Sequence, residues 1–349
     1  MEEVKFYNVK EAPFRVYGAC PESFPDRFIR LPERVAEQTS AKVLHHSQNT
    51  SGIRVRFATD SDVISIKVES DYLHSMAHMT TFSSAGFDLY EYTEEGGRFI
   101  GVFQPYGSKD PEKFVNGYEA EIKLPNIDGC TDFDGKTHFY QINFPLYSRV
   151  TELYVGVREG AKLEKGLPYR DIKPLVYYGS SITQGAVASR PGNCHAAIIS
   201  RRLGIDFYNL GFSGACRGEK EVVEYLATLD PSVYIIEYDH NSPVRELRER
   251  HAPLAMRLRE THPSTPIILA TRPDYYFTEV DANRRRIVLD TYESMLASGD
   301  KNVYFLDGSA FFDSDERFEY TADGVHPNDM GCFLMANALT PLLKRILDL

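Results

Sequence analysis

The chain has 349 residues, of which 42% are hydrophobic and 26% are charged, and its formal net charge is −11. This balance is typical of a soluble globular protein, and the length suggests about two domains. The acidic charge disfavours nucleic acid and anionic membranes as partners, because both attract basic surfaces.

The N-terminal residues contain early acidic side chains and no hydrophobic segment of the signal-peptide type, so we expect a cytoplasmic location. The five cysteines are scattered and form no CxxC pair, which favours reduced thiols over disulfides or a zinc site. No run approaches the roughly 20 apolar residues of a membrane helix.

The first half of the chain alternates apolar and polar residues, which is the period of a strand with one buried face. This pattern occurs in residues 52–57, 63–69, 118–124 and 152–157. Residues 87–103 read as a hairpin that turns near Gly96 and Gly97. We therefore predict an all-β sandwich or jelly-roll domain over residues 1–168, with its boundary in the polar stretch 160–172.

In the second half, short apolar runs alternate with longer amphipathic segments. The strands are predicted at 175–178, 206–210, 233–237, 267–271 and 303–306. The helices are predicted at 193–203, 219–229, 244–261, 279–298 and 329–347. Such alternation predicts a flavodoxin-like α/β/α domain over residues 169–349, with a five-stranded parallel sheet and the active groups at the carboxyl ends of its strands.

Dinucleotide, phosphate-loop, HExxH and GxSxG motifs are absent from the sequence. One combination of residues remains. Ser181 follows the first strand of the parallel domain, and Asp323 and His326 lie three residues apart before the last helix. A serine hydroxyl becomes a nucleophile when a histidine removes its proton, and a carboxylate on the other ring nitrogen orients that histidine.

Two further loops follow strands of the same predicted sheet. Gly214 offers a backbone N–H and Asn241 a side-chain amide, and with the N–H of Ser181 these donors would form an oxyanion hole. Taken singly, each residue has an ordinary explanation as a helix cap or turn residue. Their joint position after strands of one sheet is what favours a catalytic site.

These motifs resemble the SGNH hydrolases, also called GDSL-type esterases and lipases, whose four blocks carry Ser, Gly, Asn and His in that order. Here "GSSIT" (179–183) is similar to the first block, "NLGFSG" (209–214) to the second and "DGVHP" (323–327) to the last. The resemblance implies that Ser181 is the nucleophile, Gly214 an oxyanion donor, and Asp323 with His326 the rest of the triad.

The sequence departs from the family pattern at two places. Ser180 stands where the family usually has Asp before the nucleophile. The third block, usually Gly-x-Asn-Asp, reads "EYDHNSP" (237–243), so the oxyanion role goes to Asn241, with Asp239 as the alternative.

The whole chain also resembles a two-domain subset of the family with an N-terminal β-sandwich. The resemblance implies a serine esterase for short acyl esters, acetyl foremost, of a carbohydrate or another small polar molecule, without cofactor or metal. Two alternatives stay open: a lipase or thioesterase for longer acyl chains, and a non-catalytic carbohydrate-binding protein. The retained Ser, Asp and His disfavour the second.

Several other residues are weaker candidates for substrate contacts. Arg217 follows Gly214 by three residues, and His240 adjoins Asn241. Arg272 and Asp274 follow the fourth predicted strand. Each is also explained as a surface or structural residue.

Overall fold

The computed structural model describes residues 3–74, 76–105, 116–124, 133–273, 278–312 and 317–349. They form two compact units, each assembled from separate parts of the chain. The first, the β unit, comprises Met1–Arg30, Gln48–Arg170 and Ser189–Asn193. The second, the α/β unit, comprises Leu31–Ser47, Asp171–Ala188 and Cys194–Leu349. The predicted domain ranges 1–168 and 169–349 stay a prediction.

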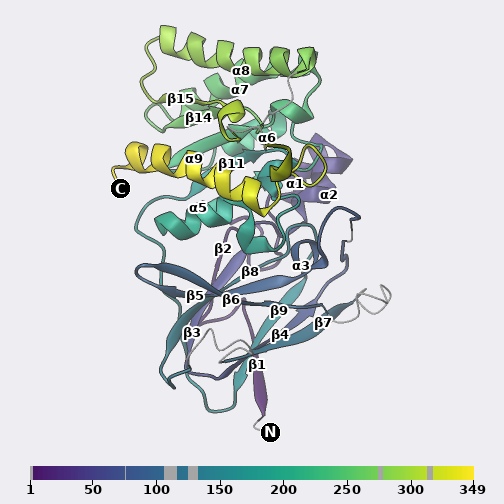
Figure 1. Cartoon of the computed structure of the whole chain (residues 1–349), viewed down its shortest axis with the longest axis vertical. Coiled ribbons are helices and arrows are strands. Elements are labelled where there is room, and N and C mark those ends of the chain that lie inside the picture. Colours follow the sequence, from purple (N-terminus) through teal and green to yellow (C-terminus); the bar gives the residue numbers. More distant parts are fainter. Residues whose placement is uncertain (1–2, 75, 106–115, 125–132, 274–277, 313–316) are drawn as a thin grey trace. The chain divides into compact units, whose positions relative to one another are not determined.

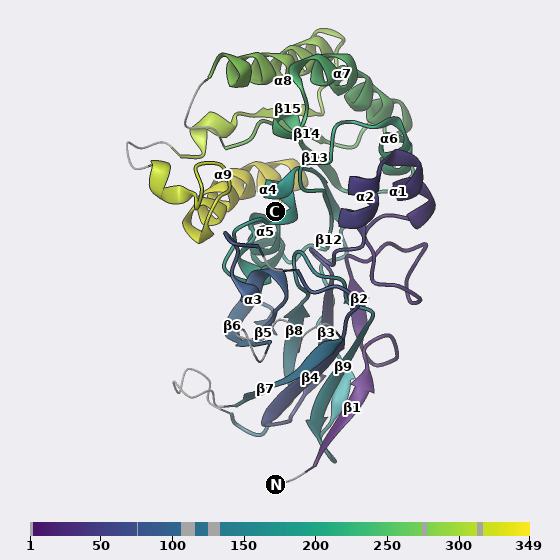
Figure 2. The ribbon, with the colours of Figure 1, turned by 90° about the vertical axis from the view of Figure 1, so that its right-hand side faces the viewer.

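The β unit contains two antiparallel sheets, as predicted (Figure 2). The four-stranded sheet has the order β1-β9-β4-β7, with β1 (Val4–Asn8), β9 (Glu152–Arg158), β4 (Val63–Glu69) and β7 (Gly117–Lys123). The six-stranded sheet has the order β10-β3-β8-β5-β6, with β10 (Leu163–Lys165), β3 (Arg54–Thr59), β8 (His138–Asn143), β5 (Phe87–Thr93) and β6 (Gly96–Phe103). A short strand, β2 (Arg15–Tyr17), pairs with β3, and one helical turn, α3 (Thr81–Ser84), precedes β5.

Alternate residues of the strands build the core of this unit. Val55 and Phe57 of β3 and Ile64 and Ile66 of β4 are fully buried in one hydrophobic cluster. These are the positions that the period-two pattern assigns to the inner face, because successive strand side chains point to opposite faces. Burial of this cluster is the main favourable contribution to folding of the unit.

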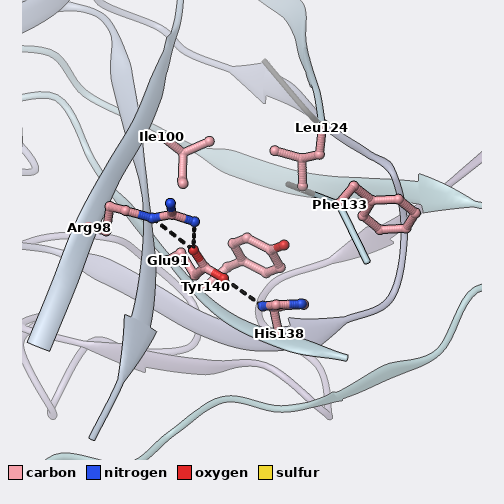
Figure 3. Close-up of a pocket in the computed structure, with 7 residues that line it drawn as sticks. All are labelled: Glu91, Arg98, Ile100, Leu124, Phe133, His138 and Tyr140. Carbon is pink, nitrogen blue, oxygen red and sulfur yellow. Dashed lines mark hydrogen bonds and ion pairs between the residues drawn. The ribbon is translucent and has the colours of Figure 1, made fainter. Parts of the chain in front are cut away.

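A charged cluster lies on β5, β6 and β8 (Figure 3). Glu91 accepts hydrogen bonds from Arg98, with Nη2 at 2.5 Å, and lies 2.5 Å from His138 Nδ1. The other ring nitrogen of His138 is 2.9 Å from Asp134. The cavity beside these groups measures about 10 Å³, which is room for about one water molecule.

The segment Ser189–Asn193 belongs to the β unit although it follows the predicted nucleophile in sequence. The Gly192 amide donates to Asp88 Oδ2 over 2.7 Å, and the Asp88 side chain is fully buried. The guanidinium of Arg190 lies 3.9 Å from the centre of the Phe99 ring. A buried carboxylate therefore anchors this short segment to β5.

The α/β unit contains the predicted parallel sheet, with the order β12-β11-β13-β14-β15. Its strands are β11 (Leu175–Gly179), β12 (Phe207–Gly211), β13 (Val233–Glu237), β14 (Ile267–Ala270) and β15 (Val303–Leu306). Strands β11, β13 and β14 are buried along their whole length, as expected for strands covered on both faces. The predicted flavodoxin-like architecture is confirmed.

Helices cover both faces of this sheet (Figure 1). On one face α5 (His195–Leu203) packs against α9 (Asp329–Leu347). On the other lie α6 (Lys220–Leu226), α7 (Val244–Thr261) and α8 (Glu279–Ala297). The short helix α4 (Ser181–Gln184) follows β11, and single 3₁₀ turns occur at Asp239–Asn241, Gly308–Ala310 and Arg317–Tyr320. A further 3₁₀ turn, Pro191–Asn193, belongs to the β unit.

Two helices of this unit come from the N-terminal part of the sequence and were not predicted. They are α1 (Glu33–Thr39) and α2 (Ala41–Ser47), and α1 packs against α6. The sequence alone places them beside the β strands, so only the three-dimensional structure assigns them to the α/β unit.

Helix α9 is long and apolar enough to meet the length and hydropathy criteria for a membrane span. Its inner face, which includes Cys332, Met335, Leu339 and Leu343, is buried. Core helices of globular domains meet the same criteria, and the packing of α9 on α5 is that of a core helix.

Candidate active site

The predicted nucleophile lies in the turn between β11 and α4. Ser180 caps the helix by accepting a hydrogen bond from the Ile182 amide over 3.0 Å, and Ser181 is the first helical residue. A Cβ atom on Gly179 would lie 2.3 Å from the carbonyl oxygen of Glu237, so only glycine fits there. The turn therefore presents Ser181 at the carboxyl end of β11.

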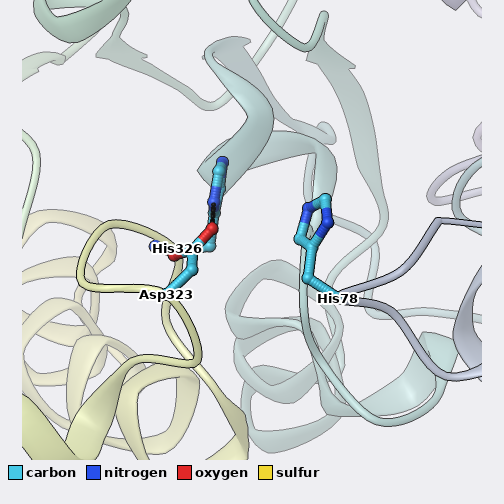
Figure 4. Close-up of side chains that lie close together, drawn as sticks. All are labelled: His78, Asp323 and His326. Atoms are coloured by element: carbon cyan, nitrogen blue, oxygen red, sulfur yellow. Dashed lines mark hydrogen bonds and ion pairs between the residues drawn. The ribbon is translucent and has the colours of Figure 1, made fainter.

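Ser181, His326 and Asp323 form a chain of short contacts. Ser181 Oγ lies 2.9 Å from His326 Nε2, and His326 Nδ1 lies 2.7 Å from Asp323 Oδ2. Figure 4 shows Asp323 directed at His326 from the loop before α9; the third side chain drawn there, His78, belongs to the β unit. The three side chains that the sequence singled out are thus brought together in hydrogen-bonding order.

The loop that carries Asp323 and His326 is closed on itself. Ala322 N donates to the carbonyl of His326 over 3.0 Å, and Asp323 Oδ1 accepts hydrogen bonds from the amides of Val325 and His326. At its end, Asn328 caps α9 by accepting from the Gly331 amide over 3.1 Å. These bonds fix the carboxylate relative to the imidazole ring.

The same contacts keep Asp323 ionised. Partial burial raises the pKa of Asp323, but the hydrogen bonds from the His326 amide and ring outweigh it, so this pKa lies below its ordinary value. A carboxylate in this state holds the proton on His326 Nδ1 and leaves Nε2 as the acceptor that faces Ser181.

Gly214 lies in the loop after β12, which is tied to the nucleophile turn. Phe212 N donates to the Gly179 carbonyl over 2.9 Å, and Ser213 N donates to the Gln184 side chain over 2.9 Å. Gly214 has a φ of 62°, in the left-handed region that favours glycine. Among the described residues, neither its amide nor that of Ser181 has a hydrogen-bond acceptor, so both N–H groups are available to a ligand.

The two alternatives in the third block have different surroundings. Asn241 Nδ2 donates to the carbonyl of Phe212 over 3.2 Å, so its amide lies beside the loop that carries Gly214. Asp239 is buried, and its carboxylate accepts the Arg272 amide over 3.2 Å. Burial raises the pKa of Asp239 to about 6 although Arg272 lowers it. This arrangement favours Asn241 as the oxyanion donor and gives Asp239 a structural contact.

The structure brings His240 and Arg272 together. Arg272 Nη1 lies 2.8 Å from His240 Nδ1, and its Nη2 lies 3.3 Å from Asp281. Burial and the positive charge of Arg272 lower the pKa of His240 to about 4, so this ring is neutral at pH 7. Arg272, whose side chain is 12% exposed, is therefore placed to orient His240.

Arg217 contacts α7. Its side chain is 38% exposed, and its Nη1 lies 3.9 Å from Glu246. The orientation towards α7 fits a surface ion pair, and a substrate contact by Arg217 stays a prediction. Asp274 lies outside the described residues.

One residue of the site was not predicted. Glu237, the last residue of β13, is buried, and its carboxyl group accepts hydrogen bonds from Ser180 Oγ at 3.0 Å and Thr183 Oγ1 at 2.7 Å. Burial and the neighbouring Asp239 raise the pKa of Glu237 to about 8, against the lowering effect of the two hydroxyls. The only feature of the sequence that could have pointed to Glu237 is its place as an acidic residue directly after the apolar run of the central strand β13.

Comparisons with known proteins identify the family of the chain. A model of the GDSL-like lipase/acylhydrolase family matches residues 172–344, and a model of the N-terminal region of SGNH hydrolase-type esterases matches residues 4–163. The chain belongs to the GDSL-like lipase/acylhydrolase, or SGNH hydrolase, family. The predicted resemblance is thereby confirmed, and the protein is a hydrolase of the esterase type. A comparison with curated proteins found no match.

Solved structures share the two-part architecture. A protein of Bacteroides ovatus ATCC 8483, named as a GDSL-like lipase, is 29% identical with a TM-score of 0.85, over 99% of this chain and 98% of that chain. Salicylyl-acyltransferase SsfX3 from a tetracycline biosynthetic pathway is 18% identical with a TM-score of 0.76, over 98% and 97%. A family two carbohydrate esterase from Clostridium thermocellum, in complex with cellohexaose, is 18% identical with a TM-score of 0.61, over 85% and 93%. At 18% identity the last two show a shared fold only.

Proposed function

We propose that this SGNH hydrolase is a serine esterase that removes short acyl groups, acetyl foremost, from a carbohydrate or another small polar molecule. The observation that carries the proposal is the Ser181–His326–Asp323 chain, with contacts of 2.9 and 2.7 Å. Both distances lie within the hydrogen-bond reach that proton transfer requires.

In the proposed reaction, His326 Nε2 takes the proton of Ser181 as Oγ attacks the ester carbonyl carbon. The resulting oxyanion accepts hydrogen bonds from the amides of Ser181 and Gly214 and from the side chain of Asn241. His326 then gives its proton to the departing alcohol oxygen, which leaves an acyl group on Ser181. Water, deprotonated by the same histidine, releases the acid and restores the serine.

Polar groups around the triad support a small polar substrate. The neutral ring of His240, oriented by Arg272, follows the same strand as Asn241 and offers a hydrogen-bonding group for a sugar hydroxyl. A carbohydrate esterase of the same fold, from Clostridium thermocellum, was solved in complex with cellohexaose, and for this reason the proposal includes carbohydrate esters. A cytoplasmic location stays a prediction.

One observation favours the alternative of a longer acyl chain. Large apolar side chains are exposed in the segments on either side of His326: Phe318 is 53% exposed, Met330 56% and Phe333 48%. Exposed apolar groups near an esterase site are suited to contact with an acyl chain. This candidate is a lipase or thioesterase with the same three catalytic residues.

Hydrolysis of p-nitrophenyl esters from acetate to palmitate tests both candidates. The Ser181→Ala variant is expected to lose on the order of 10³-fold or more in kcat. Ser200→Ala is the matched control, because it also removes a buried serine hydroxyl, bonded to the Ile205 carbonyl at 2.6 Å, and leaves the triad intact.

Faster hydrolysis of acetate than of palmitate esters supports the short-acyl proposal, and the reverse preference supports the lipase. Equal rates for wild type and Ser181→Ala would overturn both. Release of acetate from acetylated xylo-oligosaccharides then tests the carbohydrate class directly.

A further inference from the structure

A carboxyl group lies next to the nucleophile turn although the sequence lacks the usual acid there. Residue 180 is a serine, at the position where the family pattern described above usually has Asp. In the parallel sheet, Gly179 of β11 pairs with Glu237 of β13, so the end of the neighbouring strand meets the start of the turn. The register thus brings a carboxyl group to Ser180 from another strand.

Glu237 contacts the turn on both sides of the nucleophile. Its backbone carbonyl accepts the Ser180 amide over 3.0 Å, and its carboxyl group accepts the Ser180 hydroxyl at 3.0 Å. Two residues beyond Ser181, the Thr183 hydroxyl donates to the same carboxyl group at 2.7 Å. One side chain therefore joins the residue before the nucleophile to the first turn of the helix after it.

We propose that Glu237 is a positioning residue for the nucleophile, and that its carboxyl group braces residues 180–183 in place of the acid that precedes the nucleophile elsewhere in the family. This proposal rests on the proposed esterase function, because it assigns Glu237 a task in that reaction. Glu237 acts through Ser180 and Thr183 and does not touch the reacting atoms.

Burial makes an acid at this position costly, and the hydrogen bonds from Ser180 and Thr183 compensate that cost. A fully buried carboxyl group is costly unless hydrogen bonds compensate it, and an apolar side chain would fill the end of a buried strand at lower cost. Its pKa of about 8 keeps it protonated at neutral pH. A neutral acid braces the turn without placing a negative charge beside the site where the oxyanion forms.

The test compares steady-state kinetics on a short p-nitrophenyl ester with the rate at which a fluorophosphonate probe labels Ser181. Glu237→Ala is expected to lower kcat and the labelling rate by about 10- to 100-fold with little change in KM, because a small displacement of a nucleophile has effects of this size. Glu237→Gln, which keeps the shape and an acceptor oxygen, should stay within about threefold of wild type.

The double variant Ser180→Asp/Glu237→Ala moves the carboxyl group to the position used by the family. We expect it to regain at least about tenfold of the lost kcat. Tyr234→Phe is the matched control: it lies on the same strand and removes a buried hydrogen bond to the Leu226 carbonyl at 2.6 Å, so it should change stability and leave kcat unchanged.

If Glu237→Ala does not fold, Glu237→Leu, which removes the carboxyl group but fills its space with an apolar side chain, replaces it in a double-mutant cycle with Thr183→Val. If the effects of the two substitutions on kcat are not additive, the result supports a positioning role for the Glu237 carboxyl group through Thr183. Additive effects would overturn the proposal. Wild-type kcat and labelling in Glu237→Ala would overturn this proposal alone. A wild type that neither hydrolyses esters nor reacts with the probe would overturn the proposed function, and this proposal with it.

Discussion

The raised pKa of Glu237 predicts how the free energies of unfolding of wild type and of the Glu237→Gln variant differ as the pH changes. Burial raises the pKa of Glu237 to about 8 in the folded protein, from 4.5 for an exposed glutamate. Between these values the folded protein holds a proton that the unfolded chain has released. The contribution of Glu237 to stability is therefore complete below pH 4.5 and is lost as the pH rises through 8.

The size of the effect follows from the two pKa values. Each pKa unit corresponds to about 1.4 kcal/mol, so the full difference between pH 4.5 and 8 amounts to about 5 kcal/mol at most. Between pH 5 and pH 8, wild type should lose about 4 kcal/mol that Glu237→Gln retains. The stability of the variant relative to wild type is thus expected to rise most steeply between about pH 5 and 7 and to level off above pH 8.

The assay is urea unfolding of both proteins at pH 5, 6, 7, 8 and 8.5, together with hydrogen exchange of the amides in β13 and β11. Glu224→Gln serves as the control, because Glu224 is exposed and its hydrogen bond with Arg257 lowers its pKa. The difference in the free energy of unfolding between Glu224→Gln and wild type should be constant across this pH range. A constant difference for Glu237→Gln as well would refute the reasoning, since Glu237 would then be ionised throughout.

Three further substitutions test separate parts of the structure. Asp323→Asn should lower kcat by about 10⁴-fold with little change in KM, since His326 loses the carboxylate that fixes its tautomer; steady-state kinetics measures this. Tyr177→Phe should raise the free energy of unfolding by about 1 kcal/mol, because the Tyr177 hydroxyl is buried and has no hydrogen-bond partner among the described residues; an unchanged or lower urea midpoint would contradict this. Gly192→Ala should cost about 2 kcal/mol, because the new Cβ would lie 2.5 Å from the Tyr90 ring and 2.8 Å from an Asp88 carboxylate oxygen, and a lower melting temperature is the expected result.

The sequence predicts the parallel sheet closely because each of its strands is a short apolar run between polar segments. The predicted strand 233–237 matches β13 residue for residue, and the predicted helices 244–261 and 329–347 match α7 and α9. A strand that is covered by helices on both faces is apolar along its whole length. Such a run can be recognised from the local sequence alone, without knowledge of the pairing of the strands.

The β unit is harder to predict because its pairing is not local. Strand β8 (His138–Asn143) pairs with β3 and β5, which lie far from it in sequence, and its run "HFYQIN" does not alternate cleanly. Its polar residues Gln141 and Asn143 are nonetheless buried, where they hydrogen-bond to each other and Asn143 bonds to Asp88. Because these buried residues are polar, the hydrophobic pattern of the sequence does not identify β8 as a central strand of its sheet.

The candidate site shows the same division between local and non-local information. Asp323 and His326 lie in one short loop and Ser181 follows a strand, so chain order and the topology of a parallel sheet suffice to predict their meeting. Glu237 reaches Ser180 only through the pairing of β11 with β13, and that register cannot be read from either strand alone. When a motif lacks its usual acidic residue, an acid on the neighbouring strand, at the paired position of the sheet, is therefore the first candidate for a replacement. In this protein that rule leads from Ser180 directly to Glu237.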